Sequence, residues 1–223
     1  AGNHTLIEAP TGSGKTLAAF LWCLNDLVCR PPVGAGVSVL YVSPLKALNN
    51  DIRRNLEGPL AGIAEVAASL GRPIPTISID VRTGDTLPSL RTRQVKRPPD
   101  VLITTPESLY LLLTARRSQT MFNSLRYLIL DEIHSLAGSK RGVHLALSLE
   151  RLEELRCAAR GAVSVEAGTG PDAEDLPTPP QAAVGSTPAA CSLVRIGLAA
   201  TQRPLEVIGR LLGGYDDEGK ARP

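Results

Sequence analysis

The sequence predicts an α/β fold in which helices cover both faces of a mostly parallel sheet. Strand-like and helix-like segments alternate along most of the chain, and parallel strands need such helical crossovers. The strand-like segments are also apolar throughout, as in strands that are buried on both faces. With 223 residues, of which 43% are hydrophobic and 21% are charged, the chain can bury the core of such a sheet.

The predicted strands and helices follow one another in a regular order. Strands are expected at residues 5–7, 37–42, 77–81, 101–104, 127–130 and 193–200. Helices are expected at residues 15–29, 45–56, 60–70, 107–114, 143–156 and 204–212. The pair Pro31-Pro32 should end the first helix, and Gly58-Pro59 should separate the second from the third, because proline lacks the amide hydrogen that a helix interior uses.

Residues 161–192 interrupt this pattern and are expected to form a disordered insertion within one domain that spans residues 1–223. They are rich in Ala, Pro, Gly and Thr and contain no aromatic residue, Lys or Arg. Such a segment cannot bury enough apolar surface to offset the entropy lost when the chain is ordered.

Composition narrows the class of protein. The formal net charge is +2, so a case for nucleic-acid binding must come from motifs. No apolar run approaches the length of a membrane span and no secretory signal opens the chain, so the expected location is cytoplasmic, with no membrane partner. The cysteines lack CxxC spacing and are expected to be reduced thiols instead of zinc ligands or disulfides; they are Cys23, Cys29, Cys157 and Cys191.

The stretch APTGSGKT joins the first predicted strand to the first predicted helix. Gly12 and Gly14 permit backbone conformations that turn consecutive amides towards an anion, and the helix adds the positive end of its dipole. Lys15 would reach the β- and γ-phosphates of ATP, and the Thr16 hydroxyl would bind Mg²⁺. The alternative is a chance glycine-rich turn. The predicted nucleotide-binding residues are Pro10, Thr11, Gly12, Ser13, Gly14, Lys15 and Thr16.

Three ionisable residues follow the most apolar predicted strand, at 127–130: Asp131, Glu132 and His134. One interpretation is a strand that surfaces into a polar loop. The other is a catalytic edge, because P-loop enzymes place a Mg²⁺-binding Asp at the end of a second strand. Asp131 would then bind the metal together with Thr16, and Glu132 would activate the attacking water. The predicted catalytic residues are Lys15, Asp131 and Glu132.

Further motifs, in order, resemble those of the Lhr-type proteins among the superfamily-two helicases. They are SPLKALNND, VRTGDT, TTPESL, KRGVHLALSLERLE and IGLAATQRPLE, together with APTGSGKT and DEIH. The resemblance implies a RecA-like P-loop domain of an ATP-dependent 3′-to-5′ helicase that acts on DNA or RNA–DNA hybrids. It also implies single-stranded DNA or RNA as a partner and a second RecA-like domain that carries an arginine finger. Because the chain begins at Ala1 and its only methionine is Met121, it is expected to be a fragment.

The same resemblance implies two sets of residues beyond the ATP site. Contacts to the sugar–phosphate backbone are expected from Pro44, Lys46, Thr83, Gly84, Thr105 and Pro106. Coupling between nucleotide and strand is expected from His134, Thr201 and Gln202. Taken singly, the strand-binding motifs also fit helix caps and ordinary turns. The family's Ser-Ala-Thr motif reads Ala199-Ala200-Thr201 here, which is expected to weaken the coupling.

Two other functions stay open. An ATP-gated clamp would bind nucleic acid without separating strands, and the alanine at position 199 favours it. A small-molecule kinase would hydrolyse ATP without regard to nucleic acid, and it would leave the motifs after the P-loop unexplained.

Overall fold

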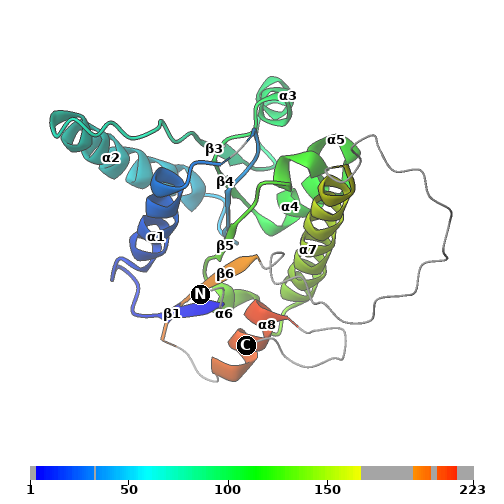
Figure 1. Ribbon diagram of the computed structural model, residues 1–223. Helices are drawn as coiled ribbons and strands as arrows, with labels where there is room; N and C mark the ends of the chain where they lie inside the picture. Colours follow the sequence, from blue (N-terminus) through cyan, green and yellow to red (C-terminus); the bar gives the residue numbers. More distant parts are fainter. Residues whose placement is uncertain (1–3, 33, 167–192, 202–204, 215–223) are drawn as a thin grey trace, which may run out of the picture.

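The computed structural model describes residues 4–32, 34–166, 193–201 and 205–214. Six strands form one sheet: β1 (Thr5–Glu8), β2 (Val39–Val42), β3 (Ile79–Arg82), β4 (Val101–Thr104), β5 (Tyr127–Leu130) and β6 (Val194–Ala199). The larger helices around it (Figure 1) are α1 (Lys15–Cys29), α2 (Leu48–Ser69), α3 (Pro88–Lys96), α4 (Pro106–Thr114), α7 (Lys140–Glu166) and α8 (Leu205–Gly213). Shorter helical segments are α5 (Arg116–Gln119), the 3₁₀ turn η1 (Thr120–Phe122) and α6 (Ile133–Leu136).

The sheet has the order β1-β6-β5-β2-β4-β3, and every pairing in it is parallel. The predicted fold class is therefore confirmed. The register is level, with Val42 opposite both Thr104 and Leu130. All six strands consequently end at one edge of the sheet, where open α/β folds bind their ligands.

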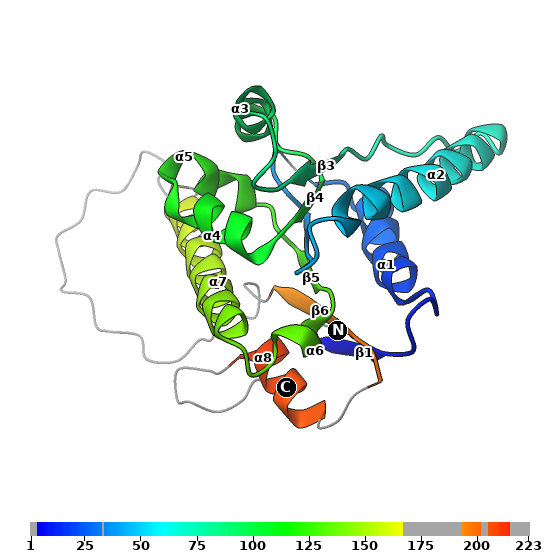
Figure 2. The same ribbon diagram turned by 180° about the vertical axis from the view of Figure 1, so that it is seen from behind.

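Two apolar layers lie on opposite faces of the sheet. Alternate strand residues such as Tyr41 and Ile129 pack with α1 and α2 on one face. The intervening residues, such as Leu40 and Leu128, pack with α4, α7 and α8 on the other. Figures 1 and 2 show these two groups of helices on either side of the strands. Burial on both faces explains why the central strands are apolar throughout.

A buried charge fixes β6 against its neighbouring helices. Arg195 is 1% exposed and pairs with Glu153 of α7 at 3.0 Å and with Glu150 at 3.2 Å. Its Nη1 also donates to the Leu212 carbonyl at 3.0 Å. These contacts position the strand whose end carries Ala199 and Thr201.

Several predicted boundaries are wrong. Helix α2 runs through Pro59, because one missing amide hydrogen is tolerated between turns rich in Leu and Ala, which are strong helix formers. Helix α7 continues to Glu166, so residues 161–166, which the composition assigns to the insertion, are helical. Residues 167–192 lie outside the described part. The sequence reasoning also missed α3, α5 and α6.

The prediction that the cysteines are reduced thiols is wrong in part. Cys23 is buried and Cys29 is exposed, and both are free thiols. Burial raises the pKa of Cys23 to about 12, so that thiol stays protonated. Cys157 is disulfide-bonded, so the expectation of reduced thiols is wrong for this residue. Spacing along the chain does not show which sulfur atoms meet in space. None of the helices in the described ranges has the length and apolar character needed to span a bilayer.

Candidate active site

The glycine-rich loop between β1 and α1 has the backbone geometry of an anion cradle. Gly12 and Gly14 lie in the left-handed region, with φ of 83° and 84°, where a residue with a Cβ would be strained. Gly14 is the N-cap of α1, and no side chain caps this helix end. The first amides of α1 are therefore available to a phosphate.

Lys15 extends over this loop. Its Nζ donates to the carbonyl oxygens of Ala9 at 2.6 Å and Pro10 at 2.9 Å. An ammonium group has three donors, and phosphate oxygens are strong acceptors for them. The lysine is therefore held where an incoming phosphate chain would meet it.

Asp131 follows β5 directly and is buried, with 7% of its surface exposed. Its Oδ2 accepts a hydrogen bond from the Tyr41 hydroxyl, and its Oδ1 accepts one from the Glu132 amide at 2.9 Å. Burial and the neighbouring Asp131 charge raise the pKa of Tyr41, so its hydroxyl stays protonated and donates. Sequence reasoning missed Tyr41, although it is the one hydroxyl-bearing residue within the β2 sequence VLYV.

Glu132 adopts φ 48°, and it is the one residue other than glycine with a positive φ among those described. Such strain is found where a side chain must be aimed. Its Oε2 lies 3.2 Å from Nε2 of His134. The Nδ1 of His134 accepts a hydrogen bond from the Ala200 amide at 3.2 Å, which assigns the ring proton to Nε2. A single imidazole thus joins the end of β5 to the end of β6.

The glycine-rich loop, Lys15, Asp131 and Glu132 face one cavity of about 450 Å³. It is lined by Thr11, Gly12, Gly14, Lys15, Thr16, Leu17, Asp51, Ile52, Asn55, Leu56, Asp131 and Glu132. The remaining predicted loop residues, Pro10 and Ser13, do not line it. Asp51 and Asn55 come from α2. Asp51 ends the motif SPLKALNND but was not predicted to lie at the nucleotide site, and Asn55 belongs to none of the motifs.

The donor set suits Mg²⁺. In the described residues no group of three or more His, Cys, Asp and Glu could hold a metal ion by itself. Mg²⁺ bound with a nucleotide uses one or two protein oxygens, with phosphates and water completing the octahedron. The hydroxyl of Thr16 and the carboxylate of Asp131 line the same cavity and supply such a pair.

The six predicted strand-binding residues follow the ends of β2, β3 and β4. Of these, Pro44, Thr83, Thr105 and Pro106 are buried. Two of them also have the helix-cap or turn role that their motifs allow. Thr105 caps α4 through a hydrogen bond from the Ser108 amide at 3.4 Å, and Thr83 accepts one from the Asp85 amide at 3.3 Å. A bound strand would therefore mainly meet backbone and exposed groups.

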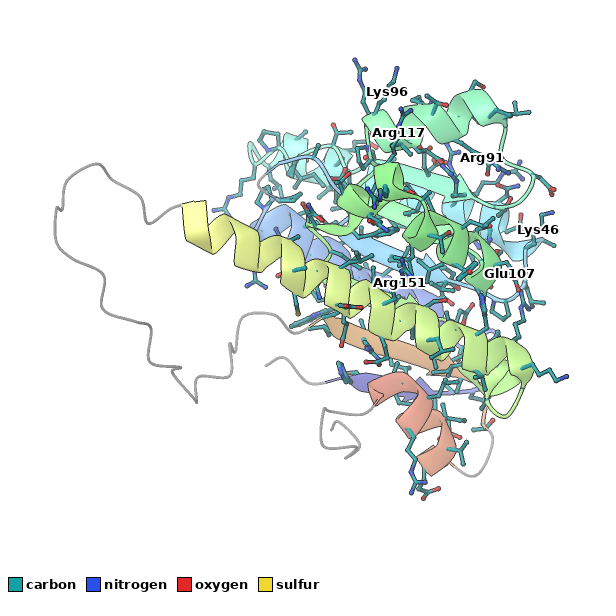
Figure 3. The ribbon with its side chains drawn as sticks, turned by 90° about the vertical axis from the view of Figure 1, so that its right-hand side faces the viewer. Lys46, Arg91, Lys96, Glu107, Arg117 and Arg151 are labelled. Carbon is teal, nitrogen blue, oxygen red and sulfur yellow. The ribbon has the colours of Figure 1, made fainter. Side chains whose placement is uncertain are left out.

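Lys46 and Gly84 are exposed. Lys46 forms an ion pair with Asp85, and Figure 3 shows its side chain at the strand-end edge of the molecule. Asp85 therefore lies beside the cation that is expected to bind a phosphate.

The sheet order separates two groups of residues along one edge. Strands β1, β6 and β5 lie together and carry the P-loop, Ala199 to Thr201 and Asp131 to His134. Strands β2, β4 and β3 form the other half and carry the six strand-binding candidates. Thr201 is exposed after β6, and Gln202 lies outside the described residues.

The parallel sheet, the glycine-rich loop and the acidic strand end define a RecA-like P-loop domain of the nucleotide-hydrolysing class. The chain belongs to the DEAD/DEAH box helicase family, whose model matches residues 1–167. It corresponds to the helicase ATP-binding domain of Lhr-type members. It is 49% identical over 96% of its length to a protein of Mycolicibacterium smegmatis named Lhr helicase/probable uracil glycosylase. It is 43% identical over 99% of its length to ATP-dependent helicase Lhr-Core protein 2 of Thermococcus barophilus.

A solved structure supports the same relationship. The Mycobacterium smegmatis helicase Lhr bound to ssDNA and AMP-PNP superposes with a TM-score of 0.74 and 47% identity, over 96% of this chain and 23% of that one. The chain spans only 12% and 22% of the length of the two curated relatives.

Proposed function

We propose that this chain is the ATP-hydrolysing part of a motor that moves 3′ to 5′ along a nucleic-acid strand and separates duplexes of DNA or RNA–DNA hybrid. One observation carries the proposal. The ATP-site candidates and the strand-binding candidates occupy neighbouring halves of a single sheet edge. A change at the ATP phosphates can therefore be transmitted through the rigid sheet to the bound nucleic-acid strand.

Each candidate at the cavity has a role in phosphoryl transfer. The P-loop amides and Lys15 bind the phosphates. Thr16 and Asp131 would hold Mg²⁺, which would neutralise negative charge on the nucleotide phosphates. The carboxylate of Glu132 orients a water molecule and takes its proton as the water oxygen attacks the γ-phosphorus. The bond to the β-phosphate oxygen then breaks, and ADP leaves.

His134 links this chemistry to the neighbouring strand. Its Nε2 donates to the Glu132 carboxylate and its Nδ1 accepts from the Ala200 amide. A change in the position of Glu132 during the ATP cycle therefore moves the segment after β6. This contact uses a backbone amide, so the coupling does not depend on a serine hydroxyl at position 199.

The proposed partners are single-stranded DNA or RNA and a second RecA-like domain elsewhere in the longer protein. Single-stranded DNA is bound in the related Lhr structure. The proposed location is the cytoplasm, where ATP and these nucleic acids occur together.

The experiment that tests this function is ATP hydrolysis by the full-length protein with and without a single-stranded oligonucleotide. The strand should raise the rate, because it stabilises the state in which both halves of the sheet edge are engaged. A rate that is indifferent to DNA and RNA would favour a small-molecule kinase.

Replacing His134 by Ala should lower the strand-stimulated rate by roughly fivefold or more, which is the size of an ordinary coupling energy, while ATP affinity changes little. The matched variant is Ala199→Ser, which restores the family residue. Because the Ala200 amide already makes the contact, Ala199→Ser should leave the stimulation unchanged. Steady-state ATPase assays over a titration of oligonucleotide measure both variants. A large gain from Ala199→Ser would show that the hydroxyl is needed.

Replacing Asp85 by Asn should strengthen binding of single-stranded DNA. The carboxylate pairs with Lys46 and both side chains are well exposed, so the change releases a cation at the strand-binding edge and removes a repulsive charge. We expect an increase in affinity of roughly two- to fivefold at low salt that disappears at high salt. Fluorescence anisotropy with a labelled oligonucleotide measures it. Unchanged or weaker binding would exclude the 83–86 loop from the phosphate path.

A further inference from the structure

Four exposed cations lie at the edge of the sheet opposite the ATP site. Lys96 and Arg97 come from the end of α3, just before β4 begins. Arg116 and Arg117 come from α5, which follows the far end of α4. Figure 3 shows Lys96 at the end of α3 and Arg117 on α5, both on the surface of the molecule. These four residues are called the amino-edge basic patch below.

The patch is not neutralised locally. Within the described parts of the chain, none of its four side chains forms a hydrogen bond or an ion pair. Of the nearby acids, Asp80 pairs with Arg93 at 3.2 Å, whereas Asp100 accepts only from the neutral Ser78 hydroxyl, at 2.7 Å. The whole chain carries a net charge of only +2. Four cations that form no ion pair, close to one such acid, therefore give this edge a local excess of positive charge that attracts an anion.

The four cations lie at the ends of helices that buried hydrogen bonds hold in place. Helix α3 is fixed to β3 by buried Gln94, whose Nε2 donates to the Val81 carbonyl at 3.1 Å. Helix α5 is fixed to α4 by buried Ser118, whose hydroxyl donates to the Leu112 carbonyl at 2.6 Å. Cations on ordered helices lose less freedom when they bind than cations on loops do.

Helix α3 connects this patch to the strand-binding edge. It begins just after the 83–86 loop, and Arg91 donates to the carbonyl oxygens of Thr86 at 2.7 Å and Gly84 at 2.6 Å. At 1.5 Å per residue, its nine residues span about 14 Å, or roughly four phosphates of a stacked strand. In Figure 3, Lys46, Arg91 and Lys96 follow one another across the face of the molecule.

We propose that the amino-edge basic patch binds the sugar–phosphate backbone of the same strand after it passes the 83–86 loop. This inference rests on the proposed function and extends its footprint to a second, sequence-independent contact. Exposed Lys and Arg side chains on helix ends bind phosphates without reading bases. The patch therefore increases the affinity for the strand and the length of strand that is bound, and it adds no preference for particular bases.

The test uses the full-length protein and two oligonucleotides of about 6 and about 24 nucleotides. The patch variant carries Lys96→Ala, Arg97→Ala, Arg116→Ala and Arg117→Ala. The control variant removes the same charge from exposed positions elsewhere, through Arg72→Ala, Lys140→Ala, Arg151→Ala and Arg210→Ala. Affinity is measured over a range of salt concentrations. Thermal unfolding shows whether each variant is folded.

For the long strand, the slope of log affinity against log salt should become shallower by about 2 to 3 in the patch variant, because each single-strand phosphate contact contributes about 0.7. The short strand and the control variant should keep the parent slope. Lysine in place of Arg97, Arg116 and Arg117 keeps the charges and should also keep the slope.

The outcomes separate the two proposals. If the parent protein binds both strands but the patch variant keeps the parent slope, the inference is wrong and the patch serves another anion, such as an acidic protein. If the patch variant shows the same decrease in salt slope for the short strand as for the long strand, the patch is not a separate contact. If the parent binds neither strand, the proposed function itself fails.

Discussion

Replacing Glu132 by Gln in the full-length protein should abolish ATP turnover and leave ATP affinity nearly unchanged. The substitution keeps the size and the polar character of the side chain but removes the group that accepts the proton of the attacking water. General-base catalysis contributes about 10²- to 10⁴-fold to a rate. The phosphate cradle and Lys15 are untouched, so binding should persist.

Single-turnover hydrolysis and nucleotide binding should be measured on the same preparation. Glu65→Gln is a matched control, because this residue makes the same chemical change on an exposed part of α2. The control should keep the parent rate. Parent-like hydrolysis by Glu132→Gln would remove Glu132 from the chemistry and leave its strained backbone without an explanation.

The second large effect concerns residues 1–223 alone, which should hydrolyse ATP very slowly and respond little to a strand. The cavity is lined from this domain alone, and the proposed second domain would supply an arginine across it. In P-loop enzymes such an arginine raises the rate about 10³- to 10⁵-fold. ATP binding should nevertheless survive, because the loop and Asp131 are present.

Comparing residues 1–223 with the full-length protein in one ATPase assay tests the expectation. The Glu132→Gln form of residues 1–223 gives the background from contaminating enzymes. Rapid, strand-stimulated hydrolysis by residues 1–223 would show that their site is complete, and the two-domain account would have to be abandoned.

All six strands of the sheet were predicted, because strands that are covered on both faces must be apolar and an apolar run is visible in the sequence. Helix α3 was missed because its sequence, PSLRTRQVK, is polar and only Gln94 in it is buried. Helix α2 was split at Pro59 because local rules weigh proline heavily, whereas a helix of 22 residues tolerates one missing hydrogen bond.

The motifs predict Lys15, Thr16, Asp131 and Glu132 as site residues, and the structure places all four around one cavity. The motifs do not predict how these residues are paired. They could not show that Tyr41 donates to Asp131, or that His134 accepts from the Ala200 amide. Both contacts join residues far apart in the chain, and the second involves backbone, which leaves no trace in the sequence.

Strand separation by the full-length protein tests the central claim most directly. The substrate should be a duplex with a single-stranded 3′ tail, and the reaction should be compared with ATP, with AMP-PNP and in the Glu132→Gln variant. The account predicts separated strands with ATP alone, because each step requires hydrolysis. Strand-stimulated ATP hydrolysis without any separation would contradict it and would identify the protein as an ATP-gated clamp.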